Sequence, residues 1–593
     1  MASGKKENHD SEDKKRATIP ASFFCSNVPA LEKTDKGKIS LLTRTIRKTR
    51  EEFEKDVREF SMGLLSLGIM PQDRIAILHE NSPEWITSDL AISSAGAISV
   101  PVYTTLSGEE TLFLLKDASV SAIIFSGPNR DKVIHLKKEL PSLKRLISTE
   151  NRGGEGVRLG ETTGVLTFEN VKKLGKESLR ERDISERIEN IGPGDTFSII
   201  YSSGTTGRQR GVVLSHGNIL SNIEAALKVI PVKGDDTYLS YLPLSHIFER
   251  MMHHLFLYAG SSIAYSKGFA YVGADIQFFR PTILTGVPFF FERLREKILE
   301  GVREAGAVKR APFNTAIKKG PDMPDGIILK KIREKVAPGL KFFISGGAAL
   351  DSGTAEFFFK IGLPVLQGYG LTETSPIVTV NTPGSNKIGT VGRPLPGVSV
   401  KISEEGEIMV KGPNVMKGYH NMPGEEAKRD GWFYTGDIGF IDKDGFLTIT
   451  GRKKDLIITS VGKNISPQKI ENLLRGDGYI KEAVVCGDNK PHLVALIFPD
   501  TARLETLGEK LGIKGPEKLL SDKAIHDFFS ERIRARLKNL ARFEQIRRFA
   551  LIEDTLSTEG GELTPTLKIK RQKVQEKYMD IIEKLYESEK TPL

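Results

Sequence analysis

The sequence predicts an α/β fold: a large N-terminal domain of α/β layers that includes a small β-barrel-like subdomain, followed by a smaller, mobile α+β C-terminal domain. Apolar strand-like runs alternate with helical segments over the first two thirds of the 593 residues. Beyond about residue 395 the runs become shorter and glycine-punctuated, and a compact unit begins at Arg452. Such alternation is typical of mostly parallel sheets covered by helices.

The elements of the first part can be placed in order. Apolar residues recur at helical spacing from Phe53 to Leu67 and stop at Gly68, which predicts a helix. Strands are then expected at Arg74–Leu78, Ala122–Ser126, Phe197–Tyr201, Thr282–Val287, Lys341–Ser345 and Pro364–Gln367, and helices at Asn218–Val229, Phe290–Ala305 and Ser352–Ile361.

The second part predicts the smaller units. Within 395–451, short strands are expected at Val398–Ser403, Glu407–Lys411, Trp432–Phe433, Gly439–Ile441 and Phe446–Thr450. In the C-terminal domain, strands are expected near Ile480–Cys486 and Leu493–Phe498, and helices near Ser521–Leu540 and Lys568–Tyr586. Residues 1–17 are strongly charged, which predicts a disordered tail. The expected domains are therefore 18–451 and 452–593.

Composition excludes several classes of protein. A hydrophobic fraction of 39% and a charged fraction of 27% describe a soluble globular protein. The two cysteines, Cys25 and Cys486, exclude a disulfide framework and favour a reducing cytoplasm. The net charge of +10 is too mild to predict a nucleic-acid partner without a concentrated basic face. No apolar run is long enough to span a bilayer.

A basic run, Arg532–Arg548, leaves the choice of partner open. Its simplest interpretation is a solvated helix face. Coenzyme A phosphates and an anionic membrane surface are alternatives, because both would attract clustered arginines. Peripheral membrane association is therefore left open. The sequence also leaves open whether the protein forms a homodimer.

A segment rich in hydroxyls and glycine follows the strand expected at Phe197–Tyr201. It reads Ser202-Ser203-Gly204-Thr205-Thr206-Gly207-Arg208-Gln209-Arg210. Small residues let backbone N–H groups approach a polyphosphate, and arginine adds charge-assisted hydrogen bonds. It is not a Walker loop, because no Gly-Lys-Ser/Thr ends it. Taken alone, it fits either a phosphate-binding loop or an ordinary surface loop.

Four more motifs follow along the chain: Gln367-Gly368-Tyr369-Gly370-Leu371-Thr372-Glu373-Thr374-Ser375, Tyr434-Thr435-Gly436-Asp437, Gly451-Arg452-Lys453-Lys454-Asp455 and Leu563-Thr564-Pro565-Thr566-Leu567-Lys568-Ile569-Lys570-Arg571. In this order, the five motifs resemble the adenylate-forming superfamily of acyl-CoA synthetases, luciferases and peptide-synthetase adenylation domains. The resemblance covers about residues 35–588. The last motif, with Arg547–Leu551 before it, most resembles the long-chain fatty acyl-CoA synthetase branch.

The resemblance implies a two-step ligase reaction. A fatty carboxylate attacks the α-phosphorus of ATP, giving acyl-adenylate and pyrophosphate, and the thiol of coenzyme A then gives acyl-CoA and AMP. ATP, Mg²⁺, coenzyme A and a fatty acid are thus the implied cofactors and substrates. A fatty acyl-AMP ligase that loads a carrier protein, and a non-catalytic lipid- or nucleotide-binding relative, remain alternatives.

The resemblance also implies roles for residues on the nucleotide side. Those expected to bind the ATP phosphates are Ser202, Ser203, Gly204, Thr205, Thr206 and Arg210, and those expected to bind adenine and ribose are Gly346, Gly347, Ala348, Gln367, Gly368, Tyr369, Asp437 and Arg452. Thr372 would contact the α-phosphate and Glu373 would hold Mg²⁺. Arg210 departs from the lysine that is usual in the family, and the two cations are not equivalent.

Further roles concern the acid, the thiol and the domain movement. Lys568 would bridge carboxylate and α-phosphate, Lys454 would be the hinge, and Gly462 would line the coenzyme A tunnel. His246 would gate the carboxylate site, and the acyl tunnel would draw on Met251–Ala264 and Thr285–Pro288. Each residue also has a plainer interpretation: a helix-start carboxylate for Glu373, a core aromatic for Tyr369, a turn residue for Asp437, a solvated basic run for Lys568, a core histidine for His246 and a tight turn for Gly462.

Overall fold

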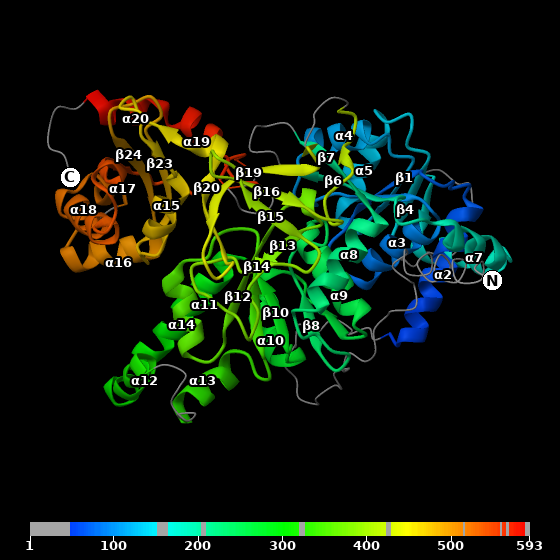
Figure 1. Cartoon of the computed structure of the whole chain (residues 1–593), viewed down its shortest axis with the longest axis horizontal. Coiled ribbons are helices and arrows are strands. Elements are labelled where there is room, and N and C mark those ends of the chain that lie inside the picture. Colours follow the sequence, from blue (N-terminus) through cyan, green and yellow to red (C-terminus); the bar gives the residue numbers. More distant parts are fainter. Residues whose placement is uncertain are drawn as a thin grey trace.

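The computed structural model describes residues 48–150, 164–202, 209–319, 327–422, 428–513, 516–557, 560–564 and 569–587. The tail predicted for residues 1–17 lies outside them. Figure 1 shows the N-terminal and central elements packed together, with the C-terminal elements, coloured orange to red, forming a smaller lobe at one end. The predicted α/β class and the smaller C-terminal domain are confirmed.

The first sheet has the strand order β17-β7-β6-β2-β1-β3-β4-β5. Its strands are β1 (Arg74–Leu78), β2 (Ile98–Pro101), β3 (Ala122–Phe125), β4 (Arg145–Ser148), β5 (Val165–Thr167), β6 (Thr196–Ser202), β7 (Arg210–Ser215) and β17 (Gly418–Tyr419). The neighbours from β6 to β5 pair in parallel, whereas β7 is antiparallel to both β6 and β17. Strands β6 and β7 therefore form a hairpin beside the parallel part of the sheet.

The second sheet has the order β14-β13-β12-β11-β10-β8-β9. Its strands are β8 (Thr237–Ser240), β9 (Ser262–Tyr265), β10 (Ile283–Gly286), β11 (Phe342–Ser345), β12 (Val365–Gly370), β13 (Ile377–Val380) and β14 (Arg393–Pro394). The neighbours from β9 to β12 pair in parallel. Ligands of α/β proteins commonly bind beyond the carboxyl ends of such strands.

The helices connect the strands of these two sheets. They are α2 (Arg50–Ser66), α3 (Pro83–Ser94), α4 (Gly108–Asp117), α5 (Arg130–Lys137), α6 (Phe168–Glu177), α7 (Glu181–Asn190), α8 (His216–Leu227), α9 (Ile247–Tyr258), α10 (Val272–Phe279), α11 (Pro288–Glu304), α12 (Ala307–Lys319), α13 (Ile327–Val336) and α14 (Ser352–Lys360). Most predicted helices agree with these bounds within two residues.

A third, antiparallel sheet contains β15 (Ser399–Ile402), β16 (Glu407–Lys411), β18 (Lys428–Arg429), β19 (Trp432–Ile441) and β20 (Leu447–Arg452). The two short strands predicted around Thr435–Asp437 are in fact one strand, β19. The prediction was wrong because the Thr-Gly-Asp sequence forms an irregularity within the strand, and β19 pairs with β16 on both sides of it. The Thr435 hydroxyl donates to the Ile408 carbonyl (2.8 Å), and the Gly436 N–H donates to the Glu407 carboxylate (2.9 Å).

The C-terminal lobe surrounds a sheet of the order β23-β24-β25. Its elements are β21 (Ile457–Ile458), β22 (Asn464–Ile465), α15 (Pro467–Arg475), β23 (Ile480–Cys486), β24 (Leu493–Pro499), α16 (Thr501–Leu511), α17 (Pro516–Ser521), α18 (Lys523–Leu537), β25 (Ile546–Leu551), α19 (Arg571–Lys577) and α20 (Met579–Glu587). The helix predicted for Lys568–Tyr586 is thus two helices, which break at Tyr578. The Tyr578 hydroxyl donates to Asp554 (2.8 Å) at this break.

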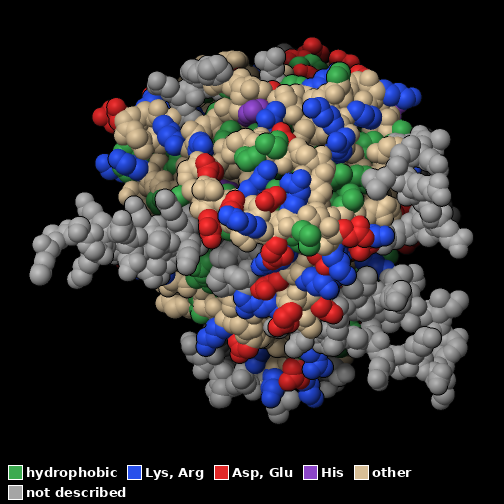
Figure 2. Space-filling view, turned by 90° about the vertical axis from the view of Figure 1, so that its right-hand side faces the viewer, with side chains coloured by type: hydrophobic (Ala, Val, Ile, Leu, Met, Phe, Trp, Pro, Cys, Tyr) green, Lys and Arg blue, Asp and Glu red, His purple; other side chains and the backbone are tan. Residues whose placement is uncertain are grey.

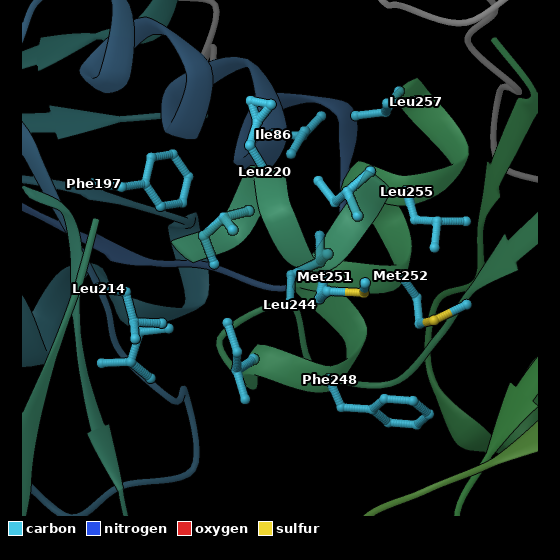
Figure 3. Packing of buried hydrophobic residues seen from close by; sticks show 14 of the residues in the cluster. Ile86, Phe197, Leu214, Leu220, Leu244, Phe248, Met251, Met252, Leu255 and Leu257 are labelled. Atoms are coloured by element: carbon cyan, nitrogen blue, oxygen red, sulfur yellow. The ribbon is translucent and has the colours of Figure 1, made fainter. Parts of the chain in front are cut away.

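The largest hydrophobic core is built around α9. Figure 3 shows Met251, Met252 and Leu255 of this helix among side chains from α3, α8, β6 and β7. Met251, Met252 and Leu255 are each 0% exposed. Burial of such side chains contributes ~1.5–3 kcal/mol each. The part of Met251–Ala264 that lies on α9 is therefore a tightly packed helix that supports the surrounding sheets.

A buried ion pair fixes α9 against α3 and β6. The Arg250 guanidinium donates from Nε to Asp89 Oδ2 (2.9 Å), from Nη2 to Asp89 Oδ1 (2.5 Å) and from Nη1 to the Ser198 hydroxyl (2.8 Å). Burial opposes ionisation of Asp89, but Arg250 and His254 outweigh it and lower the pKa of the Asp89 carboxyl. Because removing one partner would strand a buried charge, the pair constrains how these elements pack.

Glu249 is a second buried charge on α9. Its carboxylate accepts hydrogen bonds from the hydroxyls of Tyr238 and Ser240, both at 2.7 Å. Burial raises the pKa of Glu249 to about 7, although these hydroxyls act in the opposite direction. The stability of this part of the fold should therefore depend on pH.

We expect the Glu249 carboxyl to lower the free energy of unfolding as the pH rises from 4.5 to about 7, and we expect Glu249→Gln to reduce this fall. The folded state binds the Glu249 proton more tightly than the unfolded state, so this contribution is complete below 4.5 and disappears as the pH approaches 7. A shift of this size corresponds to about 3 kcal/mol. Thermal unfolding across this range should show the variant gaining on the wild type.

Glu224→Gln is the matched control, since Glu224 lies on α8 at a partly exposed position and accepts from the Tyr258 hydroxyl at 3.4 Å. A difference between Glu249→Gln and the wild type that stays constant with pH would contradict the prediction.

Candidate active site

The predicted phosphate-binding segment connects the two strands of the β6–β7 hairpin. Ser202 ends β6, Arg210 begins β7, and the two residues pair across the hairpin. The structure therefore places Arg210 next to the start of the segment. The predicted residues Ser203, Gly204, Thr205 and Thr206 lie outside the described residues.

Thr372 and Glu373 follow β12, the strand that carries Tyr369. They lie in a short 3₁₀ turn, η3 (Thr372–Thr374), beyond the carboxyl end of the strand. The Thr374 hydroxyl shapes this turn, because it accepts from the Leu371 N–H (2.9 Å) and donates to the Pro376 carbonyl (2.7 Å). Glu373 is partly exposed. It is therefore a carboxylate at a sheet end, rather than one at the start of a regular helix.

Tyr419 joins Glu373 to Arg210, and the sequence did not single it out. Its hydroxyl donates to Glu373 Oε1 (3.1 Å), and the Arg210 guanidinium carbon lies 5.4 Å from the centre of its ring. Burial and the charge of Glu373 raise the pKa of the Tyr419 phenol. The antiparallel pairing of β17 with β7 places Tyr419 beside Arg210, and a bond from the Met416 N–H to the Glu373 carbonyl holds the same segment against Glu373; no local pattern encodes either contact.

Asp437, Tyr369 and Arg452 form a second cluster. The Tyr369 hydroxyl donates to Asp437 Oδ2 (2.7 Å), and Arg452 Nε lies 2.9 Å from Asp437 Oδ1. Asp437 is buried within β19, so it is not a turn residue. Burial and the Asp437 charge raise the pKa of the Tyr369 phenol well above its usual range. Tyr369 is thus a core aromatic whose hydroxyl faces a buried charge.

The two clusters belong to one site. Burial opposes the charge of Arg452, but its pKa is raised by the carboxylates of Asp437, Asp455 and Glu373. Partial desolvation of its ammonium and repulsion from Arg452 and Arg210 lower the pKa of Lys454, although the residue as a whole is exposed. The charges of Glu373 and Arg210 in the first cluster thus act on cations of the second, and Tyr369 of the second cluster is four residues from Glu373 of the first. The structure therefore brings residues from four of the five motifs to the same region.

The predicted adenine residues lie at neighbouring strand ends. Gly346, Gly347 and Ala348 follow β11, and Gln367 and Gly368 lie on β12. Gly347 has a φ of +83°, which favours glycine. The Gln367 amide, oriented so that both ends are satisfied, donates to the Thr390 carbonyl (3.1 Å) and accepts from the Leu350 N–H (2.8 Å). The strand end is thereby held in a fixed shape.

His246 is two residues from Phe248, whose ring packs beside Gly346. It caps the N-terminus of α9, where its Nδ1 accepts from the Phe248 N–H (3.2 Å). A Cβ added at Gly346 would lie 3.0 Å from the Phe248 ring, so a larger residue here would require the ring to shift. His246 is partly exposed, whereas His253 and His254 are fully buried. The core-histidine interpretation therefore describes the latter two residues.

The remaining predicted residues lie at the junction with the C-terminal lobe. Lys454 is exposed in η4 (Lys453–Asp455), directly after β20. Gly462, with a φ of +74°, lies in the turn between β21 and β22. Lys568 is outside the described residues. Its near neighbour Lys570 lies 3.7 Å from Glu110 of α4, which places this part of the chain against the N-terminal domain.

The described residues contain neither a ready-made metal cluster nor a helix suited to crossing a membrane. Over the described ranges, no three His, Cys, Asp or Glu side chains are grouped so that they could hold a metal ion. In the same ranges, no helix has both the length and the apolar character needed to cross a membrane.

Figure 2 shows basic and acidic side chains interspersed on the face near α2 and α7. Mixed charge of this kind is typical of a solvated surface.

Comparison with known proteins gives relatives over most of the chain. Residues 30–420 match the family model described as AMP-binding enzyme, and residues 454–590 match the AMP-binding enzyme C-terminal domain. The long-chain-fatty-acid–CoA ligase FadD15 of Mycobacterium bovis is 32% identical over 91% of this chain and 92% of its own length. Long-chain-fatty-acid–CoA ligase 5 of Rattus norvegicus is 31% identical, covering 88% of this chain and 82% of its own.

Solved structures show the same fold. ATP-bound MatB from Rhodopseudomonas palustris has a TM-score of 0.64 at 25% identity, covering 90% of this chain and 94% of that chain. The anthranilate CoA ligase AuaEII, in complex with anthranoyl-AMP, has a TM-score of 0.68 at 20% identity, covering 90% and 93%. From the matched models, the relatives and the fold together, the chain belongs to the AMP-binding enzyme family.

Proposed function

We propose that this protein is a long-chain fatty acid–CoA ligase, which uses ATP to form an acyl-adenylate and then transfers the acyl group to coenzyme A. The observation that carries the proposal is the convergence of Arg210, Glu373, Asp437 and Arg452 on one region. The names of the long-chain relatives support the acid and the thiol acceptor. The proposal places the enzyme in the cytoplasm, and peripheral membrane association and a homodimer stay predictions of the sequence.

Asp437 would bind the ribose of ATP. A carboxylate has about four lone-pair positions. Tyr369 uses one position on Oδ2 and Arg452 uses one on Oδ1, so both oxygens keep capacity to accept from ribose hydroxyls. Because Arg452 and Tyr369 both bond the buried Asp437 carboxylate, the acceptor is oriented. The residues proposed to form the adenine side are Gly346, Gly347, Ala348, Gln367, Gly368 and Tyr369.

Arg210 and Thr372 would act on the phosphates. Arg210 would join Ser202 and residues 203–206 at the β- and γ-phosphates, and Thr372 would contact the α-phosphate. The fatty carboxylate and the α-phosphate are both anions, so these donors would reduce their repulsion and align them for in-line attack. His246, at the start of α9, would stand at the carboxylate side.

The donor set at Glu373 fits Mg²⁺ shared with a nucleotide. Mg²⁺ is commonly bound by one or two carboxylates together with substrate phosphates and water. Glu373 offers a single, partly exposed carboxylate, and the described residues offer no complete metal cluster around it. Bound there, Mg²⁺ would neutralise charge on the phosphate oxygens.

We further propose the boundaries and the moving parts. The N-terminal domain would span 18–451 with its β-rich part near 395–451, and the C-terminal domain would span 452–593. Lys454 would act as the hinge, and Gly462 would reach the thiol path after rotation. Support comes from the family models, which end at residue 420 and resume at residue 454.

The test of the function is fatty acid-dependent exchange of pyrophosphate into ATP, followed by coenzyme A-dependent release of AMP. A panel of acids from about C2 to C20 should give the greatest rates with long chains, since each buried methylene contributes ~0.8 kcal/mol. Transfer to a holo-carrier protein but not to coenzyme A would indicate an acyl-AMP ligase. Absence of exchange with every acid would indicate a non-catalytic binding protein.

We expect Lys568→Ala to slow adenylate formation by about 100-fold or more, because a cation facing developing charge stabilises the transition state. Thioester formation from supplied acyl-AMP should change far less, since the carboxylate is then already activated. The two half-reactions are measured separately. Equal losses in both would refute the role proposed for Lys568.

Ion pairs between α11 and the C-terminal lobe would stabilise the position that the lobe has in this structure. Arg503 Nη2 lies 3.3 Å from Glu296 and 3.5 Å from Glu300, and Arg293 Nη1 lies 3.7 Å from Asp500. These pairs are partly exposed, so each contributes at most ~1 kcal/mol. Such weak contacts suit a lobe that must dock for one step and leave for the next.

We expect Arg503→Glu to slow adenylate formation about 2- to 5-fold, because the variant would repel α11 by up to ~1 kcal/mol. Acyl transfer from supplied acyl-AMP should be unchanged or faster. The combined change Arg503→Glu with Glu296→Arg should recover part of the loss. Arg182→Glu is the matched control, since Arg182 pairs with Glu186 on the surface of α7 at 2.7 Å. Failure of the charge swap to recover any rate would contradict the docking role.

A further inference from the structure

We propose that Tyr419 is a positioning residue that holds the carboxylate of Glu373 and the guanidinium of Arg210 in one arrangement, and so sets the metal and phosphate side of the site. The inference rests on the proposed function, in which Glu373 binds Mg²⁺ and Arg210 binds phosphate. Tyr419 is not itself given a contact with substrate. Its action is through the two residues that it touches.

The backbone around Tyr419 is fastened to β7, the strand that begins with Arg210. The Lys417 N–H donates to the Val213 carbonyl (2.9 Å), and the His420 N–H donates to the Gly211 carbonyl (2.7 Å). A Cβ at Gly211 would lie 3.1 Å from His420 Cβ, so glycine permits this close approach. The position of the Tyr419 ring is therefore fixed relative to Arg210.

The same segment is also fastened to the Glu373 turn. The Met416 N–H donates to the Glu373 carbonyl (2.9 Å), and the Asn414 amide donates to the Thr374 carbonyl (2.9 Å). Tyr419 adds the side-chain contact, from its hydroxyl to Glu373 Oε1 (3.1 Å). This hydrogen bond restrains Oε1 and so limits the orientations that the Glu373 carboxylate can adopt.

The Tyr419 ring also orients the cation. The Arg210 guanidinium carbon lies 5.4 Å from the ring centre, within the range of a cation–π contact. A planar guanidinium is oriented by an aromatic face in a way that a compact ammonium is not. Tyr419 thus gives a reason why arginine is suited to this position of this chain.

Two variants separate the two contacts. Tyr419→Phe keeps the ring and removes the hydrogen bond to Glu373, whereas Tyr419→Leu removes both contacts. Tyr578→Phe is a matched control: the Tyr578 hydroxyl donates to Asp554 (2.8 Å), and the Lys577 ammonium lies 5.2 Å from its ring, in the C-terminal lobe. The two Phe variants lose the same kind of hydrogen bond, but only Tyr419 touches the proposed site.

The first readout is the equilibrium binding of ATP. Binding is measured by calorimetry at a series of Mg²⁺ concentrations, without fatty acid. We expect Tyr419→Phe to raise the Mg²⁺ concentration for half-maximal binding by about 10-fold, because partners that orient a metal ligand commonly matter to that extent. Tyr578→Phe should leave it unchanged. An unchanged Mg²⁺ dependence in Tyr419→Phe would overturn the proposal.

The second readout is the coupling between Tyr419 and Arg210. Arg210→Lys should weaken ATP binding in the wild type but add little to Tyr419→Leu, since the orienting ring is then already absent. Fully multiplicative effects would overturn the link to Arg210, and Tyr419→Phe carries the test if Tyr419→Leu does not fold. Wild-type protein that binds ATP with Mg²⁺ but shows no fatty acid-dependent exchange would refute the proposed function, and not the role of Tyr419.

Discussion

The ionic contact between Asp437 and Arg452 is the interaction on which the arrangement of the site depends. Asp437 lies on β19 of the third sheet, its second partner Tyr369 lies on β12 of the second sheet, and Arg452 ends β20 just before the C-terminal lobe. A buried carboxylate is costly unless it is paired and hydrogen-bonded. Satisfying Asp437 therefore forces two sheets and the start of the C-terminal lobe into one geometry.

Buried polar groups stabilise the scaffold behind this site. The Asp89–Arg250 pair connects α3, α9 and β6, and β6 ends at Ser202 while α9 begins beside His246. The Arg250 guanidinium thus holds both elements close to the ends that carry site residues. Along α9, Arg250 is about one helical turn from His246. Along β6, its partner Ser198 is four residues from Ser202. Rigid elements of this kind position side chains more accurately than loops do.

The C-terminal lobe is held differently. Its own hydrophobic clusters include Leu474, Ile497 and Phe529, all of which are fully buried within the lobe. Its contacts with α11 are partly exposed ion pairs such as Arg503–Glu296. A unit with its own core and a polar interface can move as a body. This difference is the physical basis for assigning the moving part of the proposed reaction to this lobe.

The sequence alone predicted the α/β class, the order of the motifs and about half of the strands, because periodicity and glycine-rich turns are local properties. It did not determine that β19 runs through Thr435–Asp437, since that depends on β16. Nor did it identify Tyr419, which lies 46 residues from its partner Glu373, or the bond between Tyr369 and Asp437 across 68 residues. These contacts follow from strand pairing and burial, which bring together side chains that no local pattern relates.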